Sequence, residues 1–199
     1  MREPRLRIDD LYGIVGHWPR LRLPAGACAT LAGPSGSGKS RLLRALADLD
    51  PSRGAVHLDG TPREHFRGPQ WRQQVVYLPA DSSWWAEYVG DHLAAVEAET
   101  LATLGFEPDV AQWRIERLST GERSRLALAR AVALGPRVLL LDEPTANLDE
   151  ATTNAVERVV EGRRGDGLSA VWVTHDPEQA KRLRAQRFEL VDGVARERA

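Results

Sequence analysis

The fold is decided by the stretch Gly33-Pro34-Ser35-Gly36-Ser37-Gly38-Lys39-Ser40, which matches the phosphate-loop pattern of Gly, four residues and then Gly-Lys-Ser. An apolar run at residues 27–32 precedes it and predicts a buried strand. The apolar positions after Ser40 have helical spacing (Leu42, Leu43, Leu46, Ala47 and Leu49). Glycines allow successive backbone N–H groups to turn inward around phosphate oxygens, and the positive end of the helix faces the same anion. The order of strand, loop and helix therefore predicts a nucleotide site in an α/β core.

Two side chains of this loop carry its chemistry. Lys39 is predicted to neutralise the β and γ phosphates, and Ser40 to offer its hydroxyl to Mg²⁺. A flexible Gly/Ser loop is the alternative, but such a loop need not lie between a strand and a helix. We therefore expect ATP and Mg²⁺ as ligands, with ATP bound by residues 33–40 and the neighbouring Arg41.

A second apolar run, Leu139-Leu140-Leu141, ends in the acidic pair Asp142-Glu143 before Pro144. The first carboxylate, at the tip of a buried strand, can hold Mg²⁺ through water. The second is placed to orient or deprotonate the water molecule that attacks phosphorus. An ordinary solvated strand end is the alternative, and the phosphate loop upstream argues against it.

The remaining pattern predicts strands that alternate with helices, which indicates an α/β fold with a mostly parallel sheet. Residues 6–31 contain short apolar groups separated by Gly and Pro, which indicates strands joined by turns. Further strands are predicted at 55–58, 74–78, 137–141, 168–174 and 188–191. Helices are predicted at 121–134, after Asp176, and after Asp149 with a buried face of Ala151, Ala155, Val156, Val159 and Val160.

Residues 81–118 have a different character. They contain Trp84, Trp85 and Trp113, and a helical pattern near 89–104 that Gly105 ends. We expect a small helical subdomain, inserted at about 81–134, within a single domain of residues 1–199.

Charge and composition exclude several classes of protein. The formal net charge of −1 over 199 residues gives no general electrostatic case for binding nucleic acid or a membrane surface. The lone cysteine, Cys28, is expected to be a packed thiol in a reducing compartment. The first residues lack the apolar core of a signal peptide, and no run of about 18 apolar residues predicts a membrane span. We expect a cytoplasmic protein that reaches a membrane only through another polypeptide.

The order of the motifs resembles that of ATP-binding-cassette (ABC) ATPases over nearly the whole chain. After the phosphate loop and the helical insertion come Leu118-Ser119-Thr120-Gly121-Glu122, the acidic pair, Ala146-Asn147-Leu148-Asp149 and Thr174-His175-Asp176. The resemblance implies a P-loop NTPase core with a mostly parallel sheet, an N-terminal antiparallel β-subdomain and an inserted α-helical subdomain. It also implies a homodimer that closes around two ATP molecules.

The resemblance assigns a role to each motif. Ser119 and Gly121 bind the γ-phosphate held by the opposite subunit, in a signature of residues 119–122 that ends at Glu122. Thr120 stands where the family has glycine; its β-branch restricts the backbone but leaves both phosphate contacts in place, so we interpret it as tolerated. Asn147 and Asp149 belong to the family's D-loop, which crosses the dimer interface. His175 matches the switch histidine that contacts the γ-phosphate.

Aromatic residues add two further expectations. Tyr12 is the best placed candidate to stack on adenine and Trp18 the alternative, although either could belong to core or edge packing. Trp84 and Trp85 lie where the family docks its membrane subunit. Adjacent exposed tryptophans would suit an interface hot spot, whereas one of two neighbours is often buried for packing.

One departure from the family pattern concerns the metal and the partner. After a strand such as 74–78 the family places a glutamine that touches Mg²⁺ and senses the transmembrane subunit, and Ala80 occupies that position here. Alanine neither ligates a metal nor donates a hydrogen bond. Asp81 could reach in after a one-residue shift, or water could complete the coordination; Gln73 and Gln74, on the predicted strand, are poor substitutes. We hypothesise that Mg²⁺ coordination and coupling are altered.

The function implied by the resemblance is the ATPase subunit of an ABC transporter, on the cytoplasmic face of the inner membrane and bound to a separate transmembrane permease. Residues 71–77 and 171–176 look most like the small bacterial ATPases of iron-export or metal-stress permeases, with haem-export cassettes as a close alternative. A soluble ABC protein of DNA repair, chromosome structure or translation would need coiled coils, zinc modules or a basic stripe. A regulator that scarcely hydrolyses ATP is a third alternative, motivated by Ala80.

We predict that Ala80→Gln changes the Mg²⁺ dependence and the turnover of ATP hydrolysis, because glutamine restores a side chain that can ligate the metal. Steady-state rates over a Mg²⁺ titration measure both properties against the wild type. The hypothesis fails if the variant and the wild type behave alike.

Overall fold

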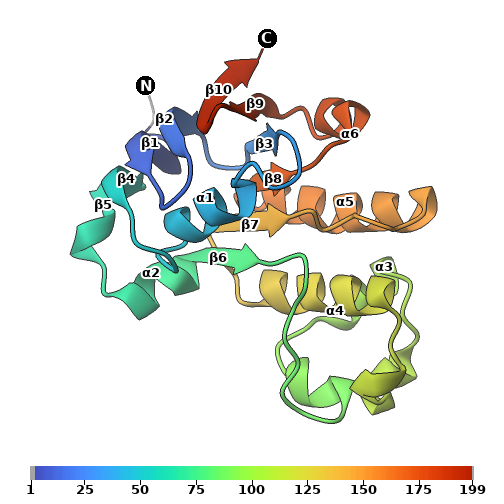
Figure 1. The fold of residues 1–199 in the computed structure, drawn as a ribbon. Coiled ribbons are helices and arrows are strands. Elements are labelled where there is room, and N and C mark those ends of the chain that lie inside the picture. Colours follow the sequence, from blue (N-terminus) through green and yellow to red (C-terminus); the bar gives the residue numbers. More distant parts are fainter. Residues whose placement is uncertain (1–2, 199) are drawn as a thin grey trace.

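The computed structural model describes residues 3–198, and within them ten strands form one sheet (Figure 1). The strand order is β5-β4-β1-β2-β10-β9-β3-β8-β7-β6. The strands are β1 (Leu6–Tyr12), β2 (His17–Leu23), β3 (Cys28–Ala32), β4 (Arg53–Leu58), β5 (Thr61–Pro62), β6 (Val75–Leu78), β7 (Val138–Asp142), β8 (Ser169–Val173), β9 (Gln186–Val191) and β10 (Val194–Arg198).

Six α-helices and four short 3₁₀ helices connect these strands within the described residues. The α-helices are α1 (Lys39–Leu46), α2 (Gly68–Gln74), α3 (Ala98–Thr103), α4 (Thr120–Ala133), α5 (Glu150–Gly165) and α6 (Pro177–Arg182). The 3₁₀ helices are η1 (Arg63–His65), η2 (Val89–His92), η3 (Pro108–Gln112) and η4 (Ile115–Arg117). No helix within residues 3–198 is long and apolar enough to cross a bilayer.

The predicted parallel core is confirmed. β3 pairs with β8 and β9, β8 pairs with β7, and β7 pairs with β6, all in parallel. Every residue of β7 and β8 is buried, as expected for strands whose two faces are both covered. Side chains alternate between the faces: Val138 and Leu140 pack in the cluster that contains α1, and Leu139 and Leu141 in the cluster that contains α4 and α5.

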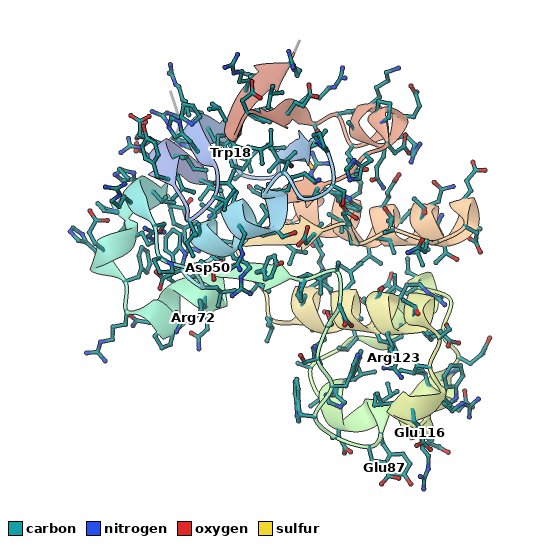
Figure 2. All side chains as sticks on the ribbon, in the orientation of Figure 1. Trp18, Asp50, Arg72, Glu87, Glu116 and Arg123 are labelled. Carbon is teal, nitrogen blue, oxygen red and sulfur yellow. The ribbon has the colours of Figure 1, made fainter. Side chains whose placement is uncertain are left out.

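The N-terminal antiparallel part is also confirmed. β1 pairs antiparallel with β2 and β4, and β4 with β5. Trp18 of β2, labelled in Figure 2, is fully buried. Its ring is edge-on to that of Phe188 of β9, with 5.1 Å between the ring centroids. Cys28 of β3 is 1% exposed, and burial raises the pKa of its thiol to about 12, so the packed-thiol interpretation holds.

The helical insertion forms, but the single helix predicted near 89–104 was wrong. The chain instead makes η2 and, after a break, α3. His92 turns inward, where its Nε2 accepts a hydrogen bond from the Ala86 N–H at 3.2 Å. Gly90 lies so close to the next segment that a Cβ there would be 2.9 Å from the Ala111 oxygen. These tertiary contacts fold the segment back on itself and override its helical periodicity.

Three smaller expectations were also wrong. Gln73 and Gln74 belong to α2, not to the strand; α2 is anchored by Trp71, which is fully buried and donates its indole N–H to the Leu46 oxygen at 2.9 Å. Leu49 is exposed because α1 ends at Leu46. Ala151, in the first turn of α5, is exposed, whereas the other four predicted core residues of that helix are buried.

We predict that Gly54→Ala lowers the free energy of unfolding by about 2–4 kcal/mol. Gly54 has a φ of +100°, and a Cβ there would lie 1.8 Å from the backbone oxygen of Asp10, where β1 shifts register against β4. Urea denaturation of the full chain measures the loss.

Gly162→Ala is the matched control. Gly162 lies in α5, and a Cβ there would have no other heavy atom of the described residues within 4 Å, apart from its own helix backbone and chain neighbours. Alanine should leave stability unchanged or raise it by up to about 1 kcal/mol. Equal losses in the two variants would show that the close approach at Gly54 is unimportant.

Candidate functional site

The predicted motifs meet at one edge of the sheet because each follows a parallel strand. The phosphate loop follows β3, Asp142 and Glu143 end and follow β7, Thr174 and His175 follow β8, and Ala80 follows β6. Since β3, β8, β7 and β6 run in parallel, their carboxyl ends lie on the same edge. Ligands of open α/β sheets bind at this edge.

The phosphate loop is curled around its own lysine. Lys39 is 5% exposed, and its ammonium donates to the backbone oxygens of Gly33 at 2.8 Å and Pro34 at 3.0 Å. Gly38 has a φ of +103°, and a Cβ there would lie 2.8 Å from a methyl of Val15, so the turn needs glycine on two grounds. The loop is thus preformed, with a positive charge at its centre and the start of α1 beside it.

Asp142 and Glu143 have different environments. Asp142 is 5% exposed, and the Tyr77 hydroxyl donates to its Oδ2 at 2.8 Å. Glu143 is half-buried and has a left-handed backbone with φ of +50°. Its Oε1 lies 3.0 Å from Nε2 of His175, so two residues predicted to be catalytic are in direct contact.

Tyr77 was missed by sequence reasoning. It pairs with Leu140 in the parallel register of β6 and β7, which brings its ring alongside the strand that ends in Asp142. Burial, reinforced by the hydrogen bond to Asp142, raises the pKa of Tyr77 well above its usual value, so the phenol stays a neutral donor. A polar ring in an otherwise apolar strand was the available signal.

The residues at this edge fit Mg²⁺. Ser40 and Asp142 supply a hydroxyl and a carboxylate, the hard oxygen donors that Mg²⁺ prefers. Within residues 3–198 no group of three or more His, Cys, Asp or Glu side chains could hold a metal by itself. That sparse set matches an ion that takes its other ligands from phosphates and water.

The segment at residues 119–122 forms an exposed helix start. Ser119 caps α4, and its hydroxyl and backbone N–H both donate to Glu122 Oε2 at 2.8 Å. These hydrogen bonds, the backbone one first, hold the pKa of Glu122 below its usual value. Thr120 is exposed and Gly121 half-buried, so Thr120 fits as the first helical residue without strain.

Residues 146–149 lie beside that helix start. A Cβ on Gly121 would be 3.0 Å from a methyl of Leu148. Asn147 is exposed with a left-handed φ of +62°, and Asp149 caps α5 by accepting from the Thr152 N–H at 2.7 Å. The two segments predicted to meet a second subunit are therefore neighbours on one surface.

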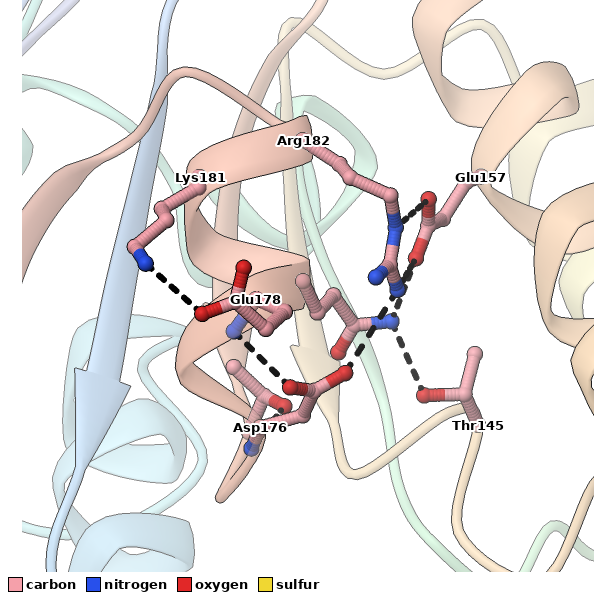
Figure 3. A network of polar contacts seen from close by, with 8 residues as sticks. Thr145, Glu157, Asp176, Glu178, Lys181 and Arg182 are labelled. Carbon is pink, nitrogen blue, oxygen red and sulfur yellow. Dashed lines mark hydrogen bonds and ion pairs between the residues drawn. The ribbon is translucent and has the colours of Figure 1, made fainter.

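A network of polar side chains reaches Thr145, in the turn that follows Asp142 and Glu143 (Figure 3). Gln179 of α6 is 1% exposed and donates to Thr145 Oγ1 at 3.2 Å and to Glu157 Oε1 at 2.9 Å. Arg182 donates to both oxygens of Glu157, at 3.0 and 2.8 Å. A pocket of about 290 Å³ adjoins this network, and its lining includes Glu143, Ala146, His175 and Gln179.

Of the two aromatic candidates for adenine, only Tyr12 is accessible. Tyr12 is 43% exposed and stacks on His17 in nearly parallel planes, with 4.0 Å between the ring centroids. The turn after it brings Val15 against Gly38 of the phosphate loop. Trp18, in contrast, is excluded as a stacking residue because it is fully buried in the core.

Comparison with known proteins identifies the family. The family described as ABC transporter matches residues 19–146, more than half of the 199 residues. The chain belongs to the ABC transporter family. Within it, the chain is 38% identical over 182 residues to the cobalt import ATP-binding protein CbiO of Rhodobacter capsulatus, covering 82% of this chain and 65% of that protein.

The chain is also similar to other ABC proteins, which include import proteins and an exporter. It is 32% identical over 200 residues to the phosphate import ATP-binding protein PstB 2 of Natronomonas pharaonis, covering 87% of this chain and 70% of that protein. It also resembles the structure of a bacterial Atm1-family ABC exporter with ATP bound, with a TM-score of 0.83 at 23% identity, over 98% of this chain and 38% of that one. This last likeness supports the ABC ATPase fold alone. The chain spans only about two thirds of the CbiO relative's length.

The structure locates the side chains at and near the position of the ABC glutamine. Ala80 and Asp81 are both exposed after the end of β6. Gln73 and Gln74 lie at the opposite end of that strand, in a pocket with Arg137 and Phe66, and are therefore away from the site. Asp81 and water stay open as substitutes, and the hypothesis of altered coordination remains a prediction.

Two tryptophans of the ABC insertion, Trp84 and Trp85, both contact Arg130. Trp85 is 72% exposed, whereas Trp84 packs against the core. The Arg130 guanidinium of α4 lies 4.7 Å from the ring centre of Trp84 and 4.8 Å from that of Trp85. Of the two alternatives for these neighbours, Trp84 serves packing and Trp85 faces outward.

We predict that Tyr77→Phe lowers ATP turnover and costs about 1–2 kcal/mol of stability, because buried Asp142 loses a donor to one carboxylate oxygen. Steady-state ATPase assays and urea denaturation measure the two effects. Tyr88→Phe, at an exposed tyrosine of the insertion, is the control and should change neither. An unaltered Tyr77→Phe protein would show that the bond to Asp142 has no energetic weight.

Proposed function

We propose that this chain hydrolyses ATP. The observation that carries the proposal is the contact of Glu143 Oε1 with His175 Nε2 at 3.0 Å, on the sheet edge that also carries the phosphate loop. In this proposal Lys39 and the backbone of residues 33–38 hold the phosphates, with Ser40 and Arg41 at the start of α1 beside them. Glu143 orients and deprotonates the attacking water, and His175 contacts the γ-phosphate and fixes the carboxylate.

Mg²⁺ would be held by Ser40 and Asp142 and would neutralise phosphate charge in the bound nucleotide. The Tyr77 hydroxyl occupies one oxygen of Asp142, so that carboxylate is oriented before any ion binds. Tyr12, exposed and close to the phosphate loop, would stack on adenine.

We further propose that the active form is a homodimer with composite sites. Ser119, Thr120, Gly121 and Glu122 would complete the ATP site of the other copy, and Asn147 and Asp149 would couple the two sites. The proposal is supported by the exposure of this surface and by the capping box that fixes the start of α4. The positive end of a helix dipole at an exposed helix start is suited to a phosphate.

The proposed partner is a separate transmembrane permease. Residues 1–199 would form one ATPase domain with a helical subdomain at about 81–134, on the cytoplasmic face of the inner membrane and attached only through the permease. Trp85 suits such an interface, because it is a large exposed ring held in place by Arg130. The proposal requires that an integral membrane protein co-purifies with this chain from native membranes.

For the cargo we propose a metal ion. The cobalt import protein of Rhodobacter capsulatus and the Fe(3+) ions import protein of Pseudomonas fluorescens, both similar to this chain, support a metal. The resemblance of residues 71–77 and 171–176 to metal-export cassettes favours export, whereas these two relatives are named as import proteins. ATP-dependent uptake of radioactive iron or cobalt ions by inverted vesicles that contain the permease would show export, and its absence would count against export. The same assay with haem in place of the ions tests haem export, the alternative.

We predict that Glu143→Gln lowers the rate of ATP hydrolysis by about 10²-fold or more. The variant should still bind ATP and should accumulate as a dimer. Glutamine has the same size but cannot accept the proton of water. ATPase assays and size-exclusion chromatography with ATP provide the measurements.

Glu150→Gln, a matched exposed glutamate at the start of α5, should retain activity. Substantial turnover in Glu143→Gln would remove Glu143 from its role. If the wild type bound ATP and did not hydrolyse it, the alternative of a nucleotide-dependent regulator would replace the proposal.

A further inference from the structure

We propose that Gln179 is a positioning residue for ATP hydrolysis: its amide holds the turn that carries Glu143 against the segment that carries His175. The inference rests on the proposed hydrolysis of ATP. It concerns a side chain of α6 that lies outside all the motifs of the sequence, and it is built on the network of Figure 3.

The turn that carries Glu143 needs external support. Glu143 and Asn147 both have left-handed backbones, with φ of +50° and +62°. Non-glycine residues in this region are strained and persist only where the surroundings hold them. Within the turn, the Ala146 N–H donates to the Glu143 oxygen at 3.1 Å. The side-chain support comes from Thr145, whose hydroxyl oxygen accepts from Gln179 Nε2 at 3.2 Å.

The two predicted catalytic residues are thereby joined twice. In front, Glu143 Oε1 lies 3.0 Å from His175 Nε2. On the other side, Thr145 is two residues after Glu143, and Gln179, in the first turn of α6, is four residues after His175. The Thr145–Gln179 hydrogen bond closes a ring that runs through both segments. We therefore expect loss of that bond to alter the distance or angle between the Glu143 carboxylate and the His175 imidazole.

The helix that carries Gln179 is itself fixed. Asp176 caps it by accepting from the Glu178 N–H at 2.8 Å, and Arg182, three residues after Gln179, grips Glu157 of α5 with two hydrogen bonds. Figure 3 shows Thr145 and Glu157 approaching α6 from separate segments. Because α6 is held against α5, the hydrogen bond from Gln179 holds Thr145, and with it the turn, in a fixed place relative to both helices.

The chemistry at position 179 calls for an amide. Its Nε2 donates two hydrogen bonds, one to a hydroxyl oxygen and one to a buried carboxylate. A glutamate there would place a second carboxylate against Glu157, which is 7% exposed. A methionine would keep the volume but remove both donors. Gln179→Met therefore removes the link to the turn with little change in packing.

The test uses the full chain with ATP and Mg²⁺ and measures kcat, KM and the melting temperature. Gln179→Met and Thr145→Val should each lower kcat by roughly ten- to a hundredfold, because misplacement of catalytic groups by a fraction of an ångström has effects of this size. KM for ATP should stay within about twofold, since phosphate binding does not involve this bond. The double variant should be no slower than Gln179→Met, because both changes remove one interaction.

Lys181→Met is the matched control. Lys181 lies on the same helix, but its hydrogen bond to Glu178 is exposed and belongs to neither the turn nor Glu157, so kcat should be retained. A loss of kcat in Lys181→Met equal to that in Gln179→Met, or additive losses in the double variant, would reduce Gln179 to a structural residue and overturn the proposal.

If Gln179→Met does not fold, Thr145→Val decides alone, because Thr145 is only partly buried and valine matches its shape. Unchanged kcat in Thr145→Val with an active wild type overturns this inference and leaves the proposed function intact. An inactive wild type overturns both.

Discussion

The structure depends on a row of parallel strands whose central members, β7 and β8, are covered on both faces. β3, β8, β7 and β6 hydrogen-bond side by side, and the central two have no exposed residue. Apolar side chains dominate such strands, so most of the polar residues of the site lie where the strands end. Because the strands are parallel, all these ends lie on one edge, and that edge receives the phosphate loop, the acidic pair and the histidine.

The same constraint explains why support for the site comes from behind the edge. A strand end that turns sharply leaves its carboxylates on loops, and loops are mobile unless other groups hold them. Tyr77 holds Asp142 from the neighbouring strand, and Gln179 holds the turn after Glu143 from α6. Lys39 performs a similar task in the phosphate loop, where it binds two backbone oxygens. Tyr77 and Gln179 therefore help to preorganise the site of this ABC protein, although neither contacts the nucleotide in the proposed reaction.

Much of this could be predicted from local pattern. The buried strand before Gly33, the caps at Asp149 and Asp176, and the continuous apolar run that became β7 are set by short-range rules, and all are confirmed. The errors have a common cause. The pattern at 89–104 had helical spacing, yet the inward turn of His92 and the close approach of Gly90 to η3 broke the helix. Gln73 and Gln74 belong to α2, which Trp71 anchors by a hydrogen bond to Leu46 of α1. The two partners are far apart in sequence, so a local pattern cannot reveal this bond.

By itself, the sequence determined which residue types could hold phosphate, metal and water, because those chemistries need fixed donors at fixed spacing along the chain. It also determined the α/β class, since periodicity and caps are local. Only the tertiary structure decided which side chains meet across the chain. It buried Trp18, left Tyr12 open, placed Tyr77 on Asp142, and joined Gln179 to the turn of Glu143. These contacts depend on strand register and helix packing, which arise from residues far apart in sequence.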